Sequence, residues 1–160
     1  MSDGPRVGLG FDVHRRSPPG SGRDLRLGGV LFAAEDGLEA HSDGDPVCHA
    51  VADAMLGSAA LGDVGEHFPD SDPETSGIAG LDLLGRAVGL VKAAGLAPAS
   101  VDVTLVCEHP AIAPRREEIR ASLATALDLP LDRVSVKATR PEGLGLSGDG
   151  IGCLAVAVIA

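Results

Sequence analysis

Aromatic side chains are nearly absent from this 160-residue chain, which has three Phe residues and neither Trp nor Tyr. A hydrophobic core must therefore be built from Val, Leu, Ile and Ala. The scarcity also removes the stacking platforms that bind single-stranded nucleic acids.

Basic residues are outnumbered by acidic ones, and the formal net charge of −10 argues against a nucleic-acid partner held by a basic surface. A small anionic ligand is still compatible, because a metal ion or backbone N–H groups can neutralise phosphate locally.

Cysteine is also sparse. Cys48, Cys107 and Cys153 are odd in number and widely spaced, with no CxxC pair. This pattern predicts buried reduced thiols, not disulfides or a thiolate zinc site. No segment approaches the ~20 apolar residues of a membrane-spanning helix, and the start MSDGPR lacks a signal-peptide pattern. We therefore expect a cytoplasmic protein without a membrane partner.

The apolar periodicity predicts a single domain over residues 1–160 with an α/β (α+β) fold. The expected elements are strands 6–14 and 25–32, a helix over 46–61, a helix over 81–91 that stops by Gly95, strand 101–107, a helix over 114–127, and strands 134–138 and 153–159. They predict a single-layer mixed sheet with about three helices on one face. The other face has no helix left to cover it, so it faces water or packs against other subunits.

The first polar cluster is GFDVH, in which Asp12 and His14 flank Val13. A spacing of two puts both side chains on the same face of a strand. Taken alone, the pair is typical of a strand end with a solvated polar face.

The second cluster is HSDGDPVCHAVAD, residues 41–53. His49 would lie on the first full turn of the predicted helix, and with Asp12 and His14 it would complete a His₂Asp metal site with one open position. His41 precedes the helix and could contact substrate, while Asp53, one turn beyond His49, could orient that ring.

The same cluster has a structural interpretation. Asp45 can N-cap the helix with Pro46 at its first position, and Asp43 can assist it. In that case the histidines are merely surface residues.

Two later clusters and one connection are weaker alone. Asp63, Asp70 and Asp72 in the turn-rich stretch 62–73 could bind hydroxyls or a cation, or serve only as turn residues. His67 in that stretch is expected to be a surface residue without a partner. The segment 136–150, with Lys137, Thr139, Arg140 and Glu142 before a Gly-rich loop, could hold a phosphate–metal pair or form a flexible hairpin. The segment CEHPAIAPR could read a base edge or simply join a strand to a helix.

Taken together, GFDVH, GG, AHSDGD, ALGDVGEHFPDSD, VDVT and VKAT followed by E and LG resemble the 2-C-methyl-D-erythritol 2,4-cyclodiphosphate synthase family. The match covers essentially the whole chain, from Val7 to the last strand. The resemblance implies conversion of 4-diphosphocytidyl-2-C-methyl-D-erythritol 2-phosphate to the cyclic diphosphate with release of CMP. This is an intramolecular phosphoryl transfer of non-mevalonate isoprenoid biosynthesis, catalysed by a phosphorus–oxygen lyase. It also implies a homotrimer with active sites between subunits, which would cover the bare sheet face.

The resemblance further implies residue roles. Zn²⁺ or another divalent cation would be held by Asp12, His14 and His49, and Mg²⁺ or Mn²⁺ by Glu142 together with the substrate diphosphate. His41 would be catalytic, with Arg140 at a second catalytic position. The implied substrate contacts are Asp12, Val13, His14, His41, Ser42, Asp63, Val64, Gly65, Phe68, Pro69, Asp70, Ser71 and Asp72, and on the cytidine side Cys107, Pro110, Ala111, Ile112, Ala113, Ala138, Thr139, Arg140 and Glu142.

The chain departs from the family pattern at two places. The family usually has KATTTE where this chain has KATRPE, so Arg140 replaces a threonine that helps to stabilise the transition state. The usual TGRGEGI is shortened to SGDGI, from Ser147 to Ile151, with Asp149 near the arginine tied to phosphate and isoprenoid diphosphate binding. The role of Arg140 and isoprenoid binding therefore stay open.

Two other functions remain to be weighed. A metal-dependent phosphohydrolase would let water attack and would release a linear product. A non-catalytic trimer would use the metal structurally, but structural zinc sites are closed and rich in Cys and His. An open site with an aspartate ligand counts against that interpretation.

Overall fold

A four-stranded mixed sheet forms the centre of the computed structural model, which describes residues 4–145 and 148–160. Its strand order is β1-β6-β4-β5. These strands are β1 (Arg6–Arg15), β6 (Gly150–Ile159), β4 (Pro98–Val106) and β5 (Val134–Thr139). β6 runs antiparallel to both β1 and β4, whereas β4 and β5 are parallel. The predicted mixed sheet and fold class are confirmed.

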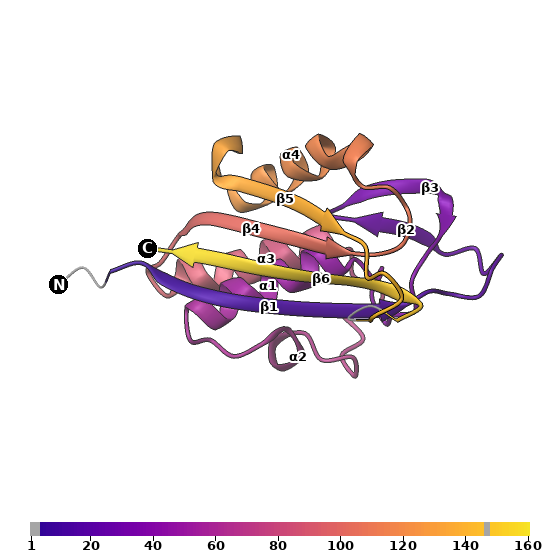
Figure 1. Ribbon diagram of the computed structural model, residues 1–160. Coiled ribbons are helices and arrows are strands. Elements are labelled where there is room, and N and C mark those ends of the chain that lie inside the picture. The colour runs from indigo at the N-terminus through magenta and orange to yellow at the C-terminus, as the bar shows by residue number, and fades with distance from the viewer. Residues whose placement is uncertain (1–3, 146–147) are drawn as a thin grey trace.

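Three helices lie on one face of this sheet (Figure 1). They are α1 (Pro46–Ser58), α3 (Gly80–Ala93) and α4 (Arg116–Leu127). α1 packs on β1 and β6, α3 packs on α1, and α4 lies against β5. The buried side chains between these layers form one cluster that is almost entirely aliphatic, as the composition requires. The single-domain organisation over 1–160 stays a prediction.

The prediction of one strand over 25–32 is wrong. This segment belongs to a hairpin of β2 (Asp24–Leu27) and β3 (Val30–Asp36), which forms a separate two-stranded sheet. Gly28 and Gly29 have φ values of +60° and +78°. Two consecutive positive φ angles produce a tight hairpin turn, and glycine adopts them without strain.

The long stretch 62–77 contains a short helix, α2 (Val64–His67), that the sequence pattern did not predict. Asp63 caps it by accepting a hydrogen bond from the Glu66 amide at 2.9 Å. His67 is half-buried, and its Nε2 lies 2.6 Å from the Leu61 carbonyl oxygen. The expectation that His67 has no partner is therefore wrong.

Two short 3₁₀ turns, η1 (Ala113–Arg115) and η2 (Leu131–Arg133), flank α4. Cys48, Cys107 and Cys153 are free and buried, which confirms the prediction of unpaired thiols. Among the described residues, none of the helices is both long and apolar enough to cross a lipid bilayer. Of the shortened SGDGI stretch, Ser147 lies outside the described residues, and Asp149 forms an exposed ion pair with Arg15 at 3.5 Å.

Candidate metal centre and substrate cavities

The side chains of Asp12, His14 and His49 converge at one point between β1 and α1. One ligand atom from each residue lies within 4.8 Å of the other two. Asp12 Oδ2 is 2.8 Å from His14 Nε2 and 3.3 Å from His49 Nδ1. The spacing of two along β1 and the first turn of α1 bring these residues together as the sequence predicted.

The close approach of α1 to β1 depends on small residues in the strand. A Cβ atom on Gly8 would lie only 2.1 Å from the Ala54 carbonyl oxygen. The beginning of α1 is set by Asp45, which is fully buried and accepts hydrogen bonds from the Val47 and Cys48 amides. This cap fixes the first turn, which carries His49. The capping interpretation of Asp45 is thus confirmed, and it holds together with the convergence of Asp12, His14 and His49, not in place of it.

Hydrogen bonds on the far side of each ring orient the two histidines. His14 Nδ1 lies 3.0 Å from the Glu39 carbonyl oxygen, so in the neutral ring this nitrogen donates and Nε2 keeps its lone pair. His49 Nε2 lies 3.2 Å from Ser42 Oγ, which leaves Nδ1 facing Asp12. The expectation that Asp53 orients His49 is wrong, because Asp53 Oδ1 instead accepts a hydrogen bond from the Val64 amide at 2.8 Å.

The donor set fits a divalent cation. Asp12 Oδ2 and His14 Nε2 are buried atoms, and outside the cluster neither has a hydrogen-bond partner in the described part of the chain. Buried polar atoms are normally paired, and a carboxylate and two imidazoles that face only one another are typical of metal ligands. Two imidazoles and one carboxylate also match the open three-ligand sites of catalytic zinc.

The charges within this cluster support one another. Burial disfavours the Asp12 carboxylate, but the adjoining His14 and His49 rings outweigh it and lower the pKa of Asp12 to about 2. Burial likewise disfavours protonated His14, but the Asp12 carboxylate outweighs it and raises the pKa of His14. Asp12 is therefore ionised and available as a ligand throughout the physiological range.

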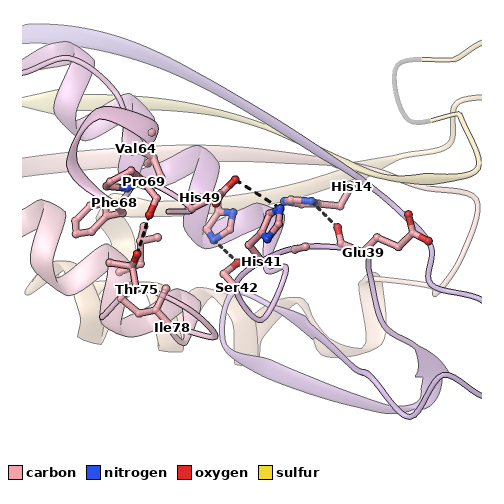
Figure 2. A pocket seen from close by; sticks show the side chains of 14 residues that line it. His14, Glu39, His41, Ser42, His49, Val64, Phe68, Pro69, Thr75 and Ile78 are labelled. Carbon is pink, nitrogen blue, oxygen red and sulfur yellow. Dashed lines mark hydrogen bonds and ion pairs between the residues drawn. The ribbon is translucent and has the colours of Figure 1, made fainter. Parts of the chain in front are cut away.

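A cavity of about 690 Å³ opens beside the two histidines. Figure 2 shows His14, His41 and His49 grouped in this cavity, with Phe68 and Pro69 on another wall. His41 is exposed, and its Nε2 lies 3.8 Å from Asp70 Oδ2. The predicted substrate residues that line this cavity are His14, His41, Ser42, Val64, Gly65, Phe68, Pro69 and Asp70.

An adjoining cavity of about 340 Å³ shares His49, Val64 and Gly65 with the first and adds Asp12 and Asp63. Three other predicted residues are placed differently. Val13 is exposed on the opposite side of β1 from Asp12, as strand alternation requires. Ser71 and Asp72 line neither cavity, and Asp72 Oδ1 accepts a hydrogen bond from the Glu74 amide. The turn interpretation therefore accounts for Asp72.

The residues predicted to contact cytidine converge on a separate cavity of about 200 Å³. We call it the cytidine cavity after this prediction. It lies where the segments after β4 and β5 meet, which parallel strands bring to one edge of the sheet. Cys107 N donates to the Thr139 carbonyl oxygen at 3.2 Å and joins the two segments. The predicted residues that line this cavity are Cys107, Pro110, Ala111, Ile112, Ala113, Ala138, Thr139 and Arg140. None of them lines the cavity beside the metal cluster.

Arg140 and Glu142 therefore line neither of the two cavities beside Asp12, His14 and His49. Arg140 lines the cytidine cavity, and Glu142 is exposed with a φ of +54°. Lys137 forms an ion pair with Asp102 across β5 and β4 and does not line the cytidine cavity.

Sequence reasoning missed several residues of these cavities. Glu39 acts through its backbone carbonyl, for which the side-chain pattern has no signal. Thr75 donates to the Pro69 and Asp72 carbonyl oxygens and holds the loop beside the first cavity. Arg116 and Glu108 join the lining of the cytidine cavity. Arg116 could have been found from its place at the start of the predicted third helix.

Comparisons with known proteins agree with this geometry. The model of the YgbB family matches residues 5–160. The 2-C-methyl-D-erythritol 2,4-cyclodiphosphate synthase of Gloeobacter violaceus is 48% identical, over 96% of this chain and 93% of its own. The bifunctional enzyme IspD/IspF of Caulobacter vibrioides is also 48% identical over 97% of this chain, which spans only 40% of that relative's length. A solved structure of 2C-methyl-D-erythritol-2,4-cyclodiphosphate synthase, in a form bound to CDP, superposes with a TM-score of 0.88 at 36% identity, covering 97% of this chain and 100% of its own.

Proposed function

Because the chain belongs to the YgbB family, we propose that it forms 2-C-methyl-D-erythritol 2,4-cyclodiphosphate in isoprenoid biosynthesis. The substrate is 4-diphosphocytidyl-2-C-methyl-D-erythritol 2-phosphate, and CMP is the second product. The observation that carries the proposal is the cluster of Asp12, His14 and His49 at the wall of a cavity large enough for a phosphorylated polyol. The CDP-bound relative supports a cytidine diphosphate ligand.

The reaction needs alignment and charge neutralisation more than a covalent nucleophile. An oxygen of the substrate's 2-phosphate forms a bond to the β-phosphorus. The bond from the β-phosphorus to the oxygen bridging the α-phosphate breaks, and CMP leaves with that oxygen. No water is consumed, so the enzyme is a phosphorus–oxygen lyase.

The residues of the first cavity and of the adjoining one bind and orient the methylerythritol part. Asp63 of the adjoining cavity and Asp70 of the first accept hydrogen bonds from hydroxyl groups, and Phe68 packs against the carbon skeleton. His41 and Ser42 face the same space and donate to the 2-phosphate. An exposed histidine beside the reacting phosphates stabilises the negative charge of the transition state.

We propose zinc, or another divalent cation, at Asp12 Oδ2, His14 Nε2 and His49 Nδ1, with Glu142 as a carboxylate for Mg²⁺ or Mn²⁺. The bound cations supply charge neutralisation to the phosphates, which a chain of net charge −10 otherwise lacks. Glu142 is a single carboxylate, and Mg²⁺ commonly takes one or two carboxylates together with substrate phosphates.

We also propose a homotrimer in which the open face of the sheet is buried. Val7 and Leu9 on β1 are 65% and 66% exposed, and Val156 lies opposite Leu9 on β6. Contiguous exposed apolar side chains mark protein interfaces. In such an assembly the cytidine cavity of one copy can complete the metal-bearing cavity of the next, that is, the cavity beside His14 and His49.

We propose a cytoplasmic location. Three buried free thiols support it, because free thiols persist in a reducing compartment.

The test is to incubate the protein with the cytidylyl substrate, Zn²⁺ and Mg²⁺, and to follow the products by phosphorus NMR. We expect CMP and a cyclic diphosphate in equal amounts, and no turnover after chelation. His41→Gln should lower kcat by about 100-fold and leave bound zinc unchanged. A linear phosphorylated product would identify a phosphohydrolase, and zinc binding without turnover would favour a structural metal.

A further inference from the structure

The segment from Cys107 to Ala113 forms most of one wall of the cytidine cavity, and an arginine outside the cavity holds it. Arg16 Nη2 donates a hydrogen bond to the carbonyl oxygen of His109. The same guanidinium lies 3.5 Å, through Nη1, from Glu35 Oε2. Glu35 Oε2 is also 3.3 Å from His109 Nδ1. The three residues therefore form a closed set of contacts that joins the chain just after β1, and β3, to this wall.

The backbone of Arg16 is held in place by hydrogen bonds of its own segment. It forms a β-bridge with Leu38, and the Ser17 amide donates to the Gly37 carbonyl oxygen at 2.9 Å. Its side chain is only 18% exposed, and that of Glu35 is 26% exposed. A partly buried, ion-paired guanidinium with an anchored backbone has little conformational freedom. Its position therefore fixes the position of the His109 carbonyl and of the cavity wall around it.

The far end of the same segment is held by the same hairpin strand. Arg115 donates to the Leu31 carbonyl oxygen, and its guanidinium carbon lies 4.9 Å from the centre of the Phe32 ring. β3 thus contacts the cavity wall at both of its ends. Within this segment Ile112 is buried, whereas Glu108, His109 and Ala111 are exposed. The exposed residues therefore depend on the contacts made by Arg16 and Arg115 for their position.

Arg16 is the first residue after the end of β1. Burial still alternates through it: Asp12, His14 and Arg16 are partly buried, while Val13 and Arg15 are exposed. The same extended segment therefore carries two proposed metal ligands and, two residues further on, the donor that holds the cytidine wall.

We propose that Arg16, fixed by Glu35, is a positioning residue that sets the cytidine cavity through the His109 carbonyl. The inference rests on the proposed function. Arg16 lines neither the cytidine cavity nor the metal-bearing cavity, so its role is to hold the wall and not to touch substrate. Losing it should weaken binding of the cytidine part and leave the metal cluster and the phosphoryl transfer step intact.

The experiment compares Arg16→Met, Arg16→Lys and Glu35→Gln with the unmodified protein. Arg86→Met on the exposed side of α3 is the matched control. CDP and inorganic pyrophosphate are titrated by calorimetry in the zinc-loaded protein. We expect Arg16→Met to raise the Kd for CDP and the KM by about tenfold, the effect of losing one charge-assisted hydrogen bond. The Kd for pyrophosphate, bound zinc and kcat should change less than about twofold. Arg16→Lys, which retains a donor, should recover part of the CDP affinity.

An unchanged Kd for CDP in Arg16→Met would overturn the proposal, as would an equal loss of affinity for pyrophosphate. If Arg16→Met does not fold, Glu35→Gln decides the question, because it keeps the side-chain volume while removing the charge that holds the guanidinium. Failure of the proposed function would be seen separately, as absence of CDP binding and turnover in the unmodified protein.

Discussion

Gly10 of β1 lies so close to α1 that a Cβ atom on it would come within 1.9 Å of the Ala50 carbonyl oxygen. His49, the proposed metal ligand of α1, immediately precedes Ala50 in the chain. The backbone separation of strand and helix at this point therefore sets how far the His49 ring stands from Asp12.

Gly10→Ala should displace α1 and open the metal cluster. The clash is with backbone, which cannot rotate away, so we expect a loss of about 1–3 kcal/mol in the free energy of unfolding and weaker zinc binding. Chemical denaturation and zinc titration measure the two effects. Gly57→Ala in the same helix is the control, because a Cβ atom on Gly57 would have no neighbour within 4 Å among the described residues. It should be neutral or stabilising by up to about 1 kcal/mol; equal behaviour of the two variants would refute the argument.

Asp12→Ala should remove metal retention and activity together. Its Oδ2 is the atom that faces both histidines, so we expect zinc affinity to fall by at least about 100-fold, the upper end of what even a supporting residue contributes. Zinc content after dialysis, measured by atomic emission, checks this. Asp132→Ala, an exposed carboxylate in η2, should retain full zinc content. An Asp12→Ala protein that keeps its zinc would disprove the ligand assignment.

The metal-free and metal-loaded forms should respond to pH with opposite signs. Burial opposes protonation of His14, but Asp12 outweighs it and raises the His14 pKa above 6.5. In chelated protein the stability that His14 contributes is therefore fully present below pH 6.5 and is lost as the pH rises through the raised pKa. Zinc requires the neutral ring, so stabilisation by zinc should grow over the same interval.

Thermal unfolding between about pH 5.5 and 8.5, with and without chelator, tests this relationship. The melting temperature of His14→Ala is the reference in each series. If the difference between wild type and His14→Ala in chelated protein increases with pH, the assigned His14–Asp12 interaction is wrong.

Leu9→Lys should prevent assembly. Leu9 is 66% exposed on the face of the sheet that bears no helix in the described parts of the chain, opposite Val156 of β6. Burying a charge in an apolar interface is strongly unfavourable. Light scattering after size exclusion should show a trimer for the unmodified protein and a smaller species for the variant. Leu131→Lys, at an exposed leucine in η2, should leave the mass unchanged; a monomeric unmodified protein would exclude the homotrimer.

The metal cluster could be predicted because local periodicity determines it. A spacing of two on a strand and a capped first helical turn specify the directions of Asp12, His14 and His49. Only the packing of the strand against the helix, which brings the three side chains together, had to be inferred. The cavity beside Cys107 was reached through resemblance instead, because it depends on two segments that the chain separates by a whole helix. Glu39 could not be found, since its contribution is a main-chain carbonyl.

The errors have a common physical origin in backbone detail. The Gly28–Gly29 pair is a hairpin signal, but the apolar residues on both sides favour one continuous strand. The helical pattern correctly predicts that Asp53 lies on the helix, one turn after His49. Its partner proved to be the Val64 amide, which a loop of unknown path brings to it.

Asp45 carries a consequence for how the molecule opens. Its carboxylate accepts hydrogen bonds from the Gly28 and Gly29 amides of the hairpin turn as well as from Val47 and Cys48 at the start of α1. Four amide protons from two distant segments thus share one buried acceptor. They should exchange with deuterated solvent through a common opening event, so that loosening the hairpin also frees the helical turn that carries His49.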